Sequence, residues 1–198
     1  MKKSWLILMI FLCSINPASG GQIVITTSDY SSGNTASYNI ETGTMTNELL
    51  PHHQDTNVKT DGTFLYILEG YGKNSIIKVD PSPISVNNVI YNYSLSGDGS
   101  ETNPQNMVFL DSKAYILLGD SDKIWVVNQN AANEASFKIG EIDISQWSDS
   151  DGSPDAALGF VYDGMVYVVL QGVIKSWPSI YETARIIKID PSTDTRVE

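Results

Sequence analysis

The densest group of acidic side chains lies in the stretch Ser148–Asp155, which reads SDSDGSPD. Asp149, Asp151 and Asp155 stand around a glycine in this stretch, and alternating carboxylates of this kind can wrap oxygen ligands around calcium. The stretch lacks the glutamate that closes an EF-hand loop, and acidic loops between strands are commonly solvated turns. The sequence therefore allows calcium at these three residues and indicates no other cofactor.

Aromatic side chains in turn-rich segments form a second group of candidates. Trp177 and Tyr181 lie in the long connection Gln171–Ala184, and Tyr71 follows a glycine in a short one. Aromatic faces stack on the apolar surfaces of ligands. We therefore predict Trp177, Tyr181 and Tyr71 as ligand-binding residues, whereas Trp125, inside an apolar stretch, is expected in the core.

No local motif for catalysis is present. The chain has no Gly-x-Ser-x-Gly, no His-Glu-x-x-His and no glycine loop for phosphate. Its histidine pair, His52-His53, has no clear third metal ligand and is interpreted as part of an exposed loop. Glu69 and Asp120 occupy comparable places in their segments, where turn chemistry is the expected role. The sequence predicts no catalytic residue, and it leaves open a site dispersed over several loops.

The first twenty residues have the three-part form of a secretory signal. Lys2 and Lys3 precede an apolar run, and small residues at Ala18-Ser19-Gly20 fit a cleavage site. The run is too short to span about 30 Å of hydrocarbon, so cleavage is favoured over an uncleaved or lipid-linked anchor. We expect residues 1–20 to be removed and the protein to be secreted or periplasmic, with no membrane span left.

The charge of the chain limits its partners. The formal net charge is −11, and it becomes −13 without Lys2 and Lys3. Such a chain is poorly suited to nucleic acid or to an anionic membrane surface. Removal of the signal also removes Cys13, the single cysteine, so disulfides and thiolate chemistry are not expected in the mature protein.

The remaining residues repeat one order of elements. An Asp-Gly or Asp-Ser turn precedes an apolar stretch centred on Tyr66, Tyr115 and Tyr167, at intervals of 49 and 52 residues. A second short β-branched stretch follows each, as in Ile77–Pro81 and Ile187–Pro191. These composition changes predict pairs of strands joined by tight turns.

Further apolar stretches at Val89–Leu95, Phe137–Ile144, Asn106–Leu110 and Ala157–Tyr162 complete about four strands in each fifty residues. No sustained helical period of apolar positions follows residue 21. The sequence predicts an all-β fold, a β-propeller-like array of four-stranded antiparallel blades. A β-sandwich or a barrel of unrelated hairpins is the alternative.

The repeats resemble those of the exported YVTN-type (YncE-like) propeller proteins. In that family, Asn-Pro-x-x before an apolar strand, an Asp-Gly turn, a Tyr-Val strand and a Val-x-Val-Ile-Asp strand recur; here Asn103-Pro104 and Tyr162–Tyr167 carry the likeness. The chain departs from the pattern at Ser153-Pro154 and at Gln54-Asp55. The resemblance implies the fold and not an activity.

We expect approximate units at residues 22–62, 63–111, 112–163 and 164–198, with the last truncated. The first unit is expected to lack its innermost strand and the last its outermost, which makes an open arc or partial propeller of three to four blades. Open blade edges favour self-association. Either a longer parent protein or an assembly of two chains would complete the ring.

Taken together, these features predict an exported, non-catalytic propeller module that binds a protein, a peptide or a glycan. Two alternatives stay open. One is a fragment of a propeller enzyme, a lyase or hydrolase with a dispersed site, and the other is a calcium-stabilised surface adhesin.

Overall fold

The computed structural model describes residues 11–15, 21–96, 101–174, 178 and 180–197, with the backbone alone described for 11–15. These residues form strands joined by loops, and the helical segments among them are three-residue 3-10 turns at Val86–Asn88, Glu134–Ser136 and Ser145–Trp147. The predicted all-β fold of four-stranded antiparallel sheets is confirmed, and so is the absence of a sustained helix in this part of the chain. No helix among the described residues is long and apolar enough to cross a bilayer.

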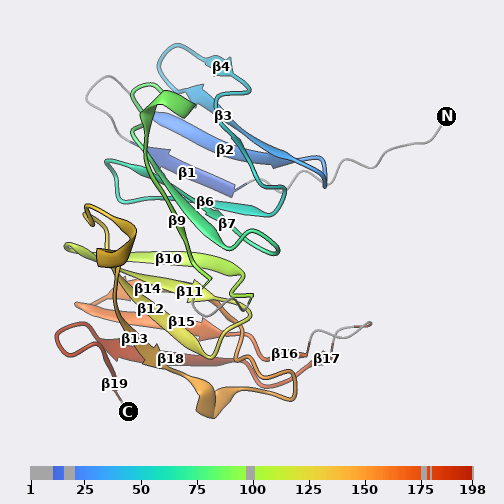
Figure 1. Cartoon of the computed structure of the whole chain (residues 1–198), viewed down its shortest axis with the longest axis vertical. Coiled ribbons are helices and arrows are strands. Elements are labelled where there is room, and N and C mark those ends of the chain that lie inside the picture. Colours follow the sequence, from blue (N-terminus) through green and yellow to red (C-terminus); the bar gives the residue numbers. More distant parts are fainter. Residues whose placement is uncertain (1–10, 16–20, 97–100, 175–177, 179, 198) are drawn as a thin grey trace. The chain divides into compact units, whose positions relative to one another are not determined.

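The chain divides into two compact units, residues 1–93 and 94–198. The first unit holds two antiparallel sheets (Figure 1). One has the order β1-β2-β3-β4, with β5 paired to β3, and the other the order β6-β7-β8-β9. The strands are β1 (Phe11–Ile15), β2 (Gln22–Ser28), β3 (Gly33–Asn39), β4 (Thr44–Thr46), β5 (Pro51–His52), β6 (Thr56–Thr60), β7 (Leu65–Glu69), β8 (Ser75–Val79) and β9 (Val89–Ser94), the last continuing one residue into the second unit.

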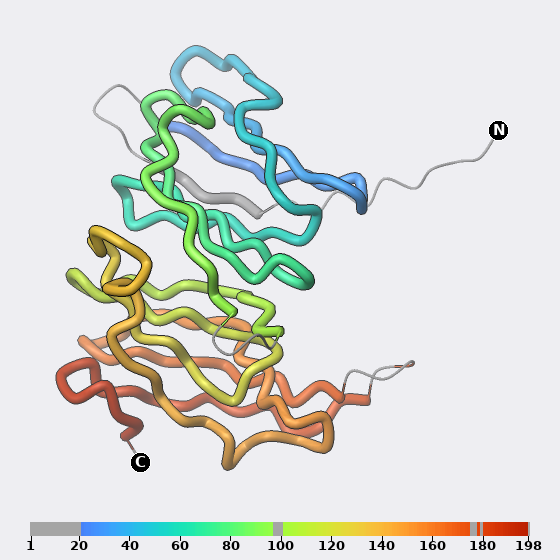
Figure 2. Tube along the Cα trace, in the orientation of Figure 1, coloured from blue at the N-terminus to red at the C-terminus, as the bar shows by residue number. Residues whose placement is uncertain are grey.

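The second unit repeats this plan, and its trace folds back and forth in neighbouring strands (Figure 2). One sheet has the order β10-β11-β12-β13 and the other the order β14-β15-β18-β19, with a separate two-stranded hairpin of β16 and β17. The strands are β10 (Pro104–Leu110), β11 (Lys113–Leu118), β12 (Lys123–Asn128), β13 (Lys138–Asp143), β14 (Ala156–Tyr162), β15 (Met165–Leu170), β16 (Val173–Ile174), β17 (Ile180–Tyr181), β18 (Arg185–Asp190) and β19 (Thr195–Val197).

The predicted turns join the first and second strands of the sheets. Asp163 and Gly164 both have positive φ, 49° and 69°, as a two-residue turn between right-twisted strands requires. In the equivalent turn before β7, Asp61 Oδ1 accepts the amides of Thr63 and Phe64 at 2.8 and 2.7 Å. Aspartate is favoured in these turns because its short side chain bonds to nearby backbone amides.

The two ends of the repeat differ from the expectation. Thr195–Val197 pairs with β18 and supplies the fourth strand of the last sheet, so the expected absence of that strand was wrong; this polar segment carries no apolar alternation to reveal it. At the other end Phe11–Ile15, inside the expected signal, pairs antiparallel with β2. Signal cleavage stays a prediction, and it would remove this strand.

Each unit has its own core between its two sheets. In the first, Val24 packs with Leu65, Ile67, Ile77 and Val79. In the second, one cluster combines Val108, Tyr115, Leu117, Ile124 and Val126 from one sheet with Val166, Val168, Leu170, Ile187 and Ile189 from the other. Alternate residues of each strand therefore face the neighbouring sheet, as the period of two dictates.

Candidate functional site

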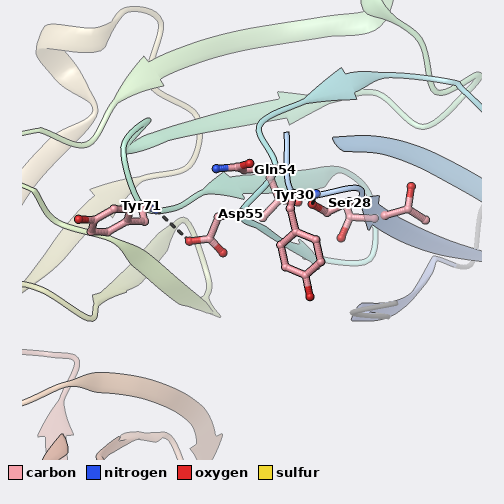
Figure 3. Close-up of a pocket in the computed structure, with 8 residues that line it drawn as sticks. Ser28, Tyr30, Gln54, Asp55 and Tyr71 are labelled. Carbon is pink, nitrogen blue, oxygen red and sulfur yellow. Dashed lines mark hydrogen bonds between the residues drawn. The ribbon is translucent and has the colours of Figure 1, made fainter. Parts of the chain in front are cut away.

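A pocket of about 250 Å³ lies in the first unit, where β2 ends, β6 begins and the β7–β8 loop returns. Two exposed tyrosines, Tyr30 and Tyr71, line it together with small polar side chains. Asp55 lies between the two tyrosines in Figure 3. The full lining is Thr26, Thr27, Ser28, Tyr30, Gln54, Asp55, Thr56 and Tyr71.

Tyr30 is held by a tight loop. Its φ is +69°, in the left-handed region that L residues seldom adopt, and its amide donates to Ser28 Oγ at 3.0 Å. Asp29 Oδ1 accepts the amides of Ser31 and Ser32 at 2.9 and 2.8 Å. These backbone hydrogen bonds lower the pKa of Asp29 to about 2, so the group accepts the amides as a carboxylate above that pH.

Tyr71 is positioned by Asp55. The Tyr71 amide donates to Asp55 Oδ2 at 3.0 Å (Figure 3), and the Gly70 amide donates to the Asp55 carbonyl at 2.7 Å. The backbone and side chain of one aspartate thus fix the start of the loop that carries the ring. Tyr71 as a whole residue is 65% exposed, which leaves its side chain accessible to a ligand.

The pocket also contains a buried hydroxyl group. Thr26 is 2% exposed, and its Oγ1 has no hydrogen-bond partner among the described residues. Buried polar groups in native proteins are normally hydrogen-bonded, so an unsatisfied one calls for an explanation. The Thr26 hydroxyl is itself inaccessible to solvent, so it belongs to the packed wall of the pocket and not to its ligand-accessible surface.

Of the predicted ligand-binding residues, the structure places Tyr71 in this pocket. Tyr181 lies on β17 in the second unit, 77% exposed, with its backbone paired to Val173. Trp177 lies outside the described residues. Trp125 is buried at 7% exposure on β12, which confirms its predicted place in the core.

The predicted calcium residues take part in a series of turns. Asp149 Oδ1 accepts the Asp151 amide at 2.9 Å, and Asp151 Oδ1 accepts the Ser153 amide at 3.1 Å. Asp155 is 3% exposed, and its Oδ2 accepts the Val173 amide at 2.7 Å. Among the described residues, no three His, Cys, Asp or Glu side chains are grouped as metal ligands.

Asp155 has the same backbone role as Asp55. Its carbonyl accepts the Gln171 amide at 3.1 Å, as that of Asp55 accepts Gly70 and that of Asn103 accepts Gly119. This repeated bond ties the start of the first strand to the end of the second in three sheets. Asp155 therefore has a structural function that does not require a cation.

Calcium at Asp149, Asp151 and Asp155 remains a prediction with a direct test. Burial raises the pKa of Asp149, and the charges of Asp151 and Asp155 add to the shift, so a bound cation would relieve repulsion. A ligand that binds only the folded state raises the melting temperature. We expect a site to show as a higher melting temperature in calcium than in chelator, abolished in Asp149→Asn; equal melting temperatures would reject it.

The acidic residues considered for a dispersed site have structural partners. Glu69 is 3% exposed; it accepts the His53 amide at 2.7 Å and the Ser75 hydroxyl. Its carboxylate thus joins the β5–β6 loop to β8. Asp120 stands in the turn after β11, and its amide donates to the Thr102 carbonyl at 3.1 Å.

The histidine pair differs from its interpretation as part of an exposed loop. His52 is 9% exposed, and its Nδ1 lies 2.8 Å from the His53 carbonyl oxygen. The interpretation was therefore wrong for His52.

Sequence reasoning did not single out most of the pocket lining. Five of the lining residues are of types that are common in strands and loops and do not indicate a binding site: Thr26, Thr27, Ser28, Gln54 and Thr56. Tyr30 shares with Tyr71 an aromatic ring in a turn-rich segment, and that common feature is the signal by which it can be found. The loops that carry Tyr30 and Tyr71 come together because their two sheets pack against each other. This packing cannot be predicted from the sequence of either loop.

Solved structures of low identity match this fold. A functionally unknown protein from Desulfotomaculum acetoxidans matches with a TM-score of 0.58 and 15% identity, over 93% of this chain and 55% of its own. Apo AztD from Citrobacter koseri gives 0.55 and 14%, over 95% and 46%. A chain of the mitotic checkpoint complex gives 0.53 and 14%, over 95% and 62%. No family model and no curated protein matches the sequence.

These comparisons support a propeller-like all-β fold, since the matched chains share the blade architecture at identities far too low to carry an activity. The chain spans between 46% and 62% of the length of these three solved chains. The fold of the described residues is therefore propeller-like and all-β.

Proposed function

We propose that this chain is a non-catalytic binding module of an exported propeller-like protein, and that the pocket between Tyr30 and Tyr71 binds a glycan. The observation that carries the proposal is the pair of exposed tyrosines, Tyr30 and Tyr71, that line one pocket together with small polar side chains. Export and membership of the YVTN-type repeat proteins are part of the same proposal, supported by the signal-like first residues and by the repeat pattern.

The pocket chemistry suits a sugar better than the other ligands considered. A pyranose ring offers an apolar C–H face, which stacks on tyrosine, and hydroxyls around its edge. Threonine and serine hydroxyls, the Gln54 amide and the Asp55 carboxylate can pair with such hydroxyls. The volume of about 250 Å³ is below the ~300–1,000 Å³ of pockets that enclose drug-sized ligands, which fits one sugar ring.

Tyr71→Ala tests the proposal. We expect the affinity for neutral hexose oligosaccharides to fall about tenfold, because an aromatic contact contributes about 0.5–1.5 kcal/mol beyond its buried area and tenfold corresponds to about 1.4 kcal/mol. Tyr71→Phe keeps the ring and should keep most of the affinity. Isothermal titration calorimetry on an oligosaccharide panel, with a peptide panel beside it, measures this.

Tyr181→Ala is the matched control, since Tyr181 is an exposed tyrosine on the other unit and its removal should leave the affinity unchanged. Binding of peptides alone, or oligosaccharide binding that is indifferent to both Tyr30→Ala and Tyr71→Ala, would contradict a glycan site in this pocket.

A further inference from the structure

The last sheet exposes apolar side chains on one face. Leu158, Phe160 and Tyr162 on β14 are 53%, 46% and 68% exposed, and Ile186 on β18 is 66% exposed. Tyr167 on β15 lies among them, its ring centroid 5.4 Å from that of Phe160. We call these five residues the outer face. A patch of this kind on a soluble protein marks an interaction surface.

The repeat shows which surface such a face packs against. By strand register, Val108, Tyr115 and Ile124 stand in the β10–β13 sheet where Phe160, Tyr167 and Ile186 stand in the last sheet. Those three residues are at most 5% exposed, and they pack on the opposite face of the last sheet through residues such as Val168 and Ile187. The natural cover of an outer face is therefore the β-branched face of another sheet.

The first unit repeats this packing in the same direction. Val24 of the β1–β4 sheet packs on Leu65, Ile67, Ile77 and Val79 of the next sheet, which correspond to Val166, Val168, Ile187 and Ile189. In each unit, the first sheet thus covers the β-branched face of the second. Among the described residues, the outer face of the last sheet has no such cover within its unit, and neither has the β-branched face of the first sheet.

That second face is present and apolar. On β2, Ile23 and Ile25 alternate with Val24 and point to the other side of the sheet, and Tyr38 of β3 is directly opposite Ile23. All three side chains are partly exposed. We call Ile23, Ile25 and Tyr38 the receiving face. The same chain therefore carries both halves of the contact that its repeats make internally.

We propose that the outer face of one copy packs on the receiving face of a second copy, head to tail. The contact joins two different faces and is therefore heterologous.

Light scattering of the purified protein at rising concentration tests the proposal. We expect a mass of at least two chains for the native sequence and a single-chain mass for Ile186→Glu, which places a charge in the contact at a position exposed enough to preserve folding. Ile139→Glu is the matched control, because Ile139 is 53% exposed on β13 and lies outside both faces. It should associate like the native chain.

Mixing separates a head-to-tail contact from a symmetric one. Ile25→Glu blocks the receiving face and Ile186→Glu the outer face, so each variant alone is monomeric, while a mixture keeps one native contact and regains dimers. Circular dichroism confirms that Ile25→Glu is folded, and Tyr38→Glu replaces it otherwise. A native protein that stays monomeric, or an Ile186→Glu protein that still associates, overturns the proposal.

Discussion

Asp194→Ala should lower the free energy of unfolding of the second unit by about 2–3 kcal/mol. Asp194 Oδ1 accepts the Tyr115 hydroxyl at 2.6 Å, and both carboxylate oxygens accept from Lys113 Nζ, at 2.8 and 2.9 Å. Tyr115 is fully buried. A buried donor that loses its acceptor costs about 1–3 kcal/mol, and the ammonium loses its counter-charge in addition.

Urea unfolding of Asp194→Ala, followed by circular dichroism, measures the loss. Glu141→Ala is the matched control, because Glu141 also pairs with a lysine, Lys138, at 2.8 Å, with its own side chain 48% exposed. Exposed pairs contribute about 0–1 kcal/mol. Similar losses in the two variants would show that the Asp194 contacts add nothing beyond a surface ion pair.

The same contact gives unfolding a dependence on alkaline pH. Burial, and then the hydrogen bond to Asp194, raise the pKa of Tyr115 above its ordinary value. The folded protein thus keeps a proton that the unfolded chain loses above about pH 10, so stability is complete below that pH and falls as the pH rises further. In Asp194→Ala the decline should end at a lower pH, since only burial and the charge of Asp190 remain to raise the pKa of Tyr115.

The sequence was sufficient for the repeat and the strand types because both follow from local chemistry. The Asp turns and the Tyr-centred strands appear where predicted, in β7, β11 and β15. The sequence did not show at which strand each unit begins. The first strands of three sheets, β6, β10 and β14, fall in the last residues of the predicted units 22–62, 63–111 and 112–163. A periodic pattern does not specify where a unit begins.

Contacts between strands and between sheets could not be predicted from local sequence patterns. Tyr115 and Tyr167 stand in the same motif, yet Tyr115 is fully buried against the β14–β19 sheet and Tyr167 is partly exposed. Asp155 was a calcium candidate by composition, whereas its bonds to Gln171 and Val173 give it the role of Asp55. Such roles depend on which strand lies beside which.

Gly159→Ala should destabilise the second unit by about 2–3 kcal/mol. A Cβ at position 159 would lie 2.5 Å from Val108 Cγ2, 3.1 Å from Leu117 Cδ1 and 3.2 Å from the Tyr167 carbonyl oxygen. Val108 and Leu117 are buried at 5% and 0% exposure, and a branched side chain in a packed core has no free rotamer to move into. Overpacking of this kind costs about 1–3 kcal/mol, at the upper end here because three groups are too close.

The test is a double-mutant cycle in urea. Val108→Ala removes the methyl group that the new Cβ meets, so the double variant should lose less stability than the two single losses added together. Gly140→Ala is the control: its Cβ would lie 3.7 Å from Val126 Cβ, an ordinary contact, and the change should stay within about 0.5 kcal/mol. Additive losses would mean that the β10 and β14 sheets do not approach each other at Gly159, and the packing from which the cover of the outer face was inferred would fail with it.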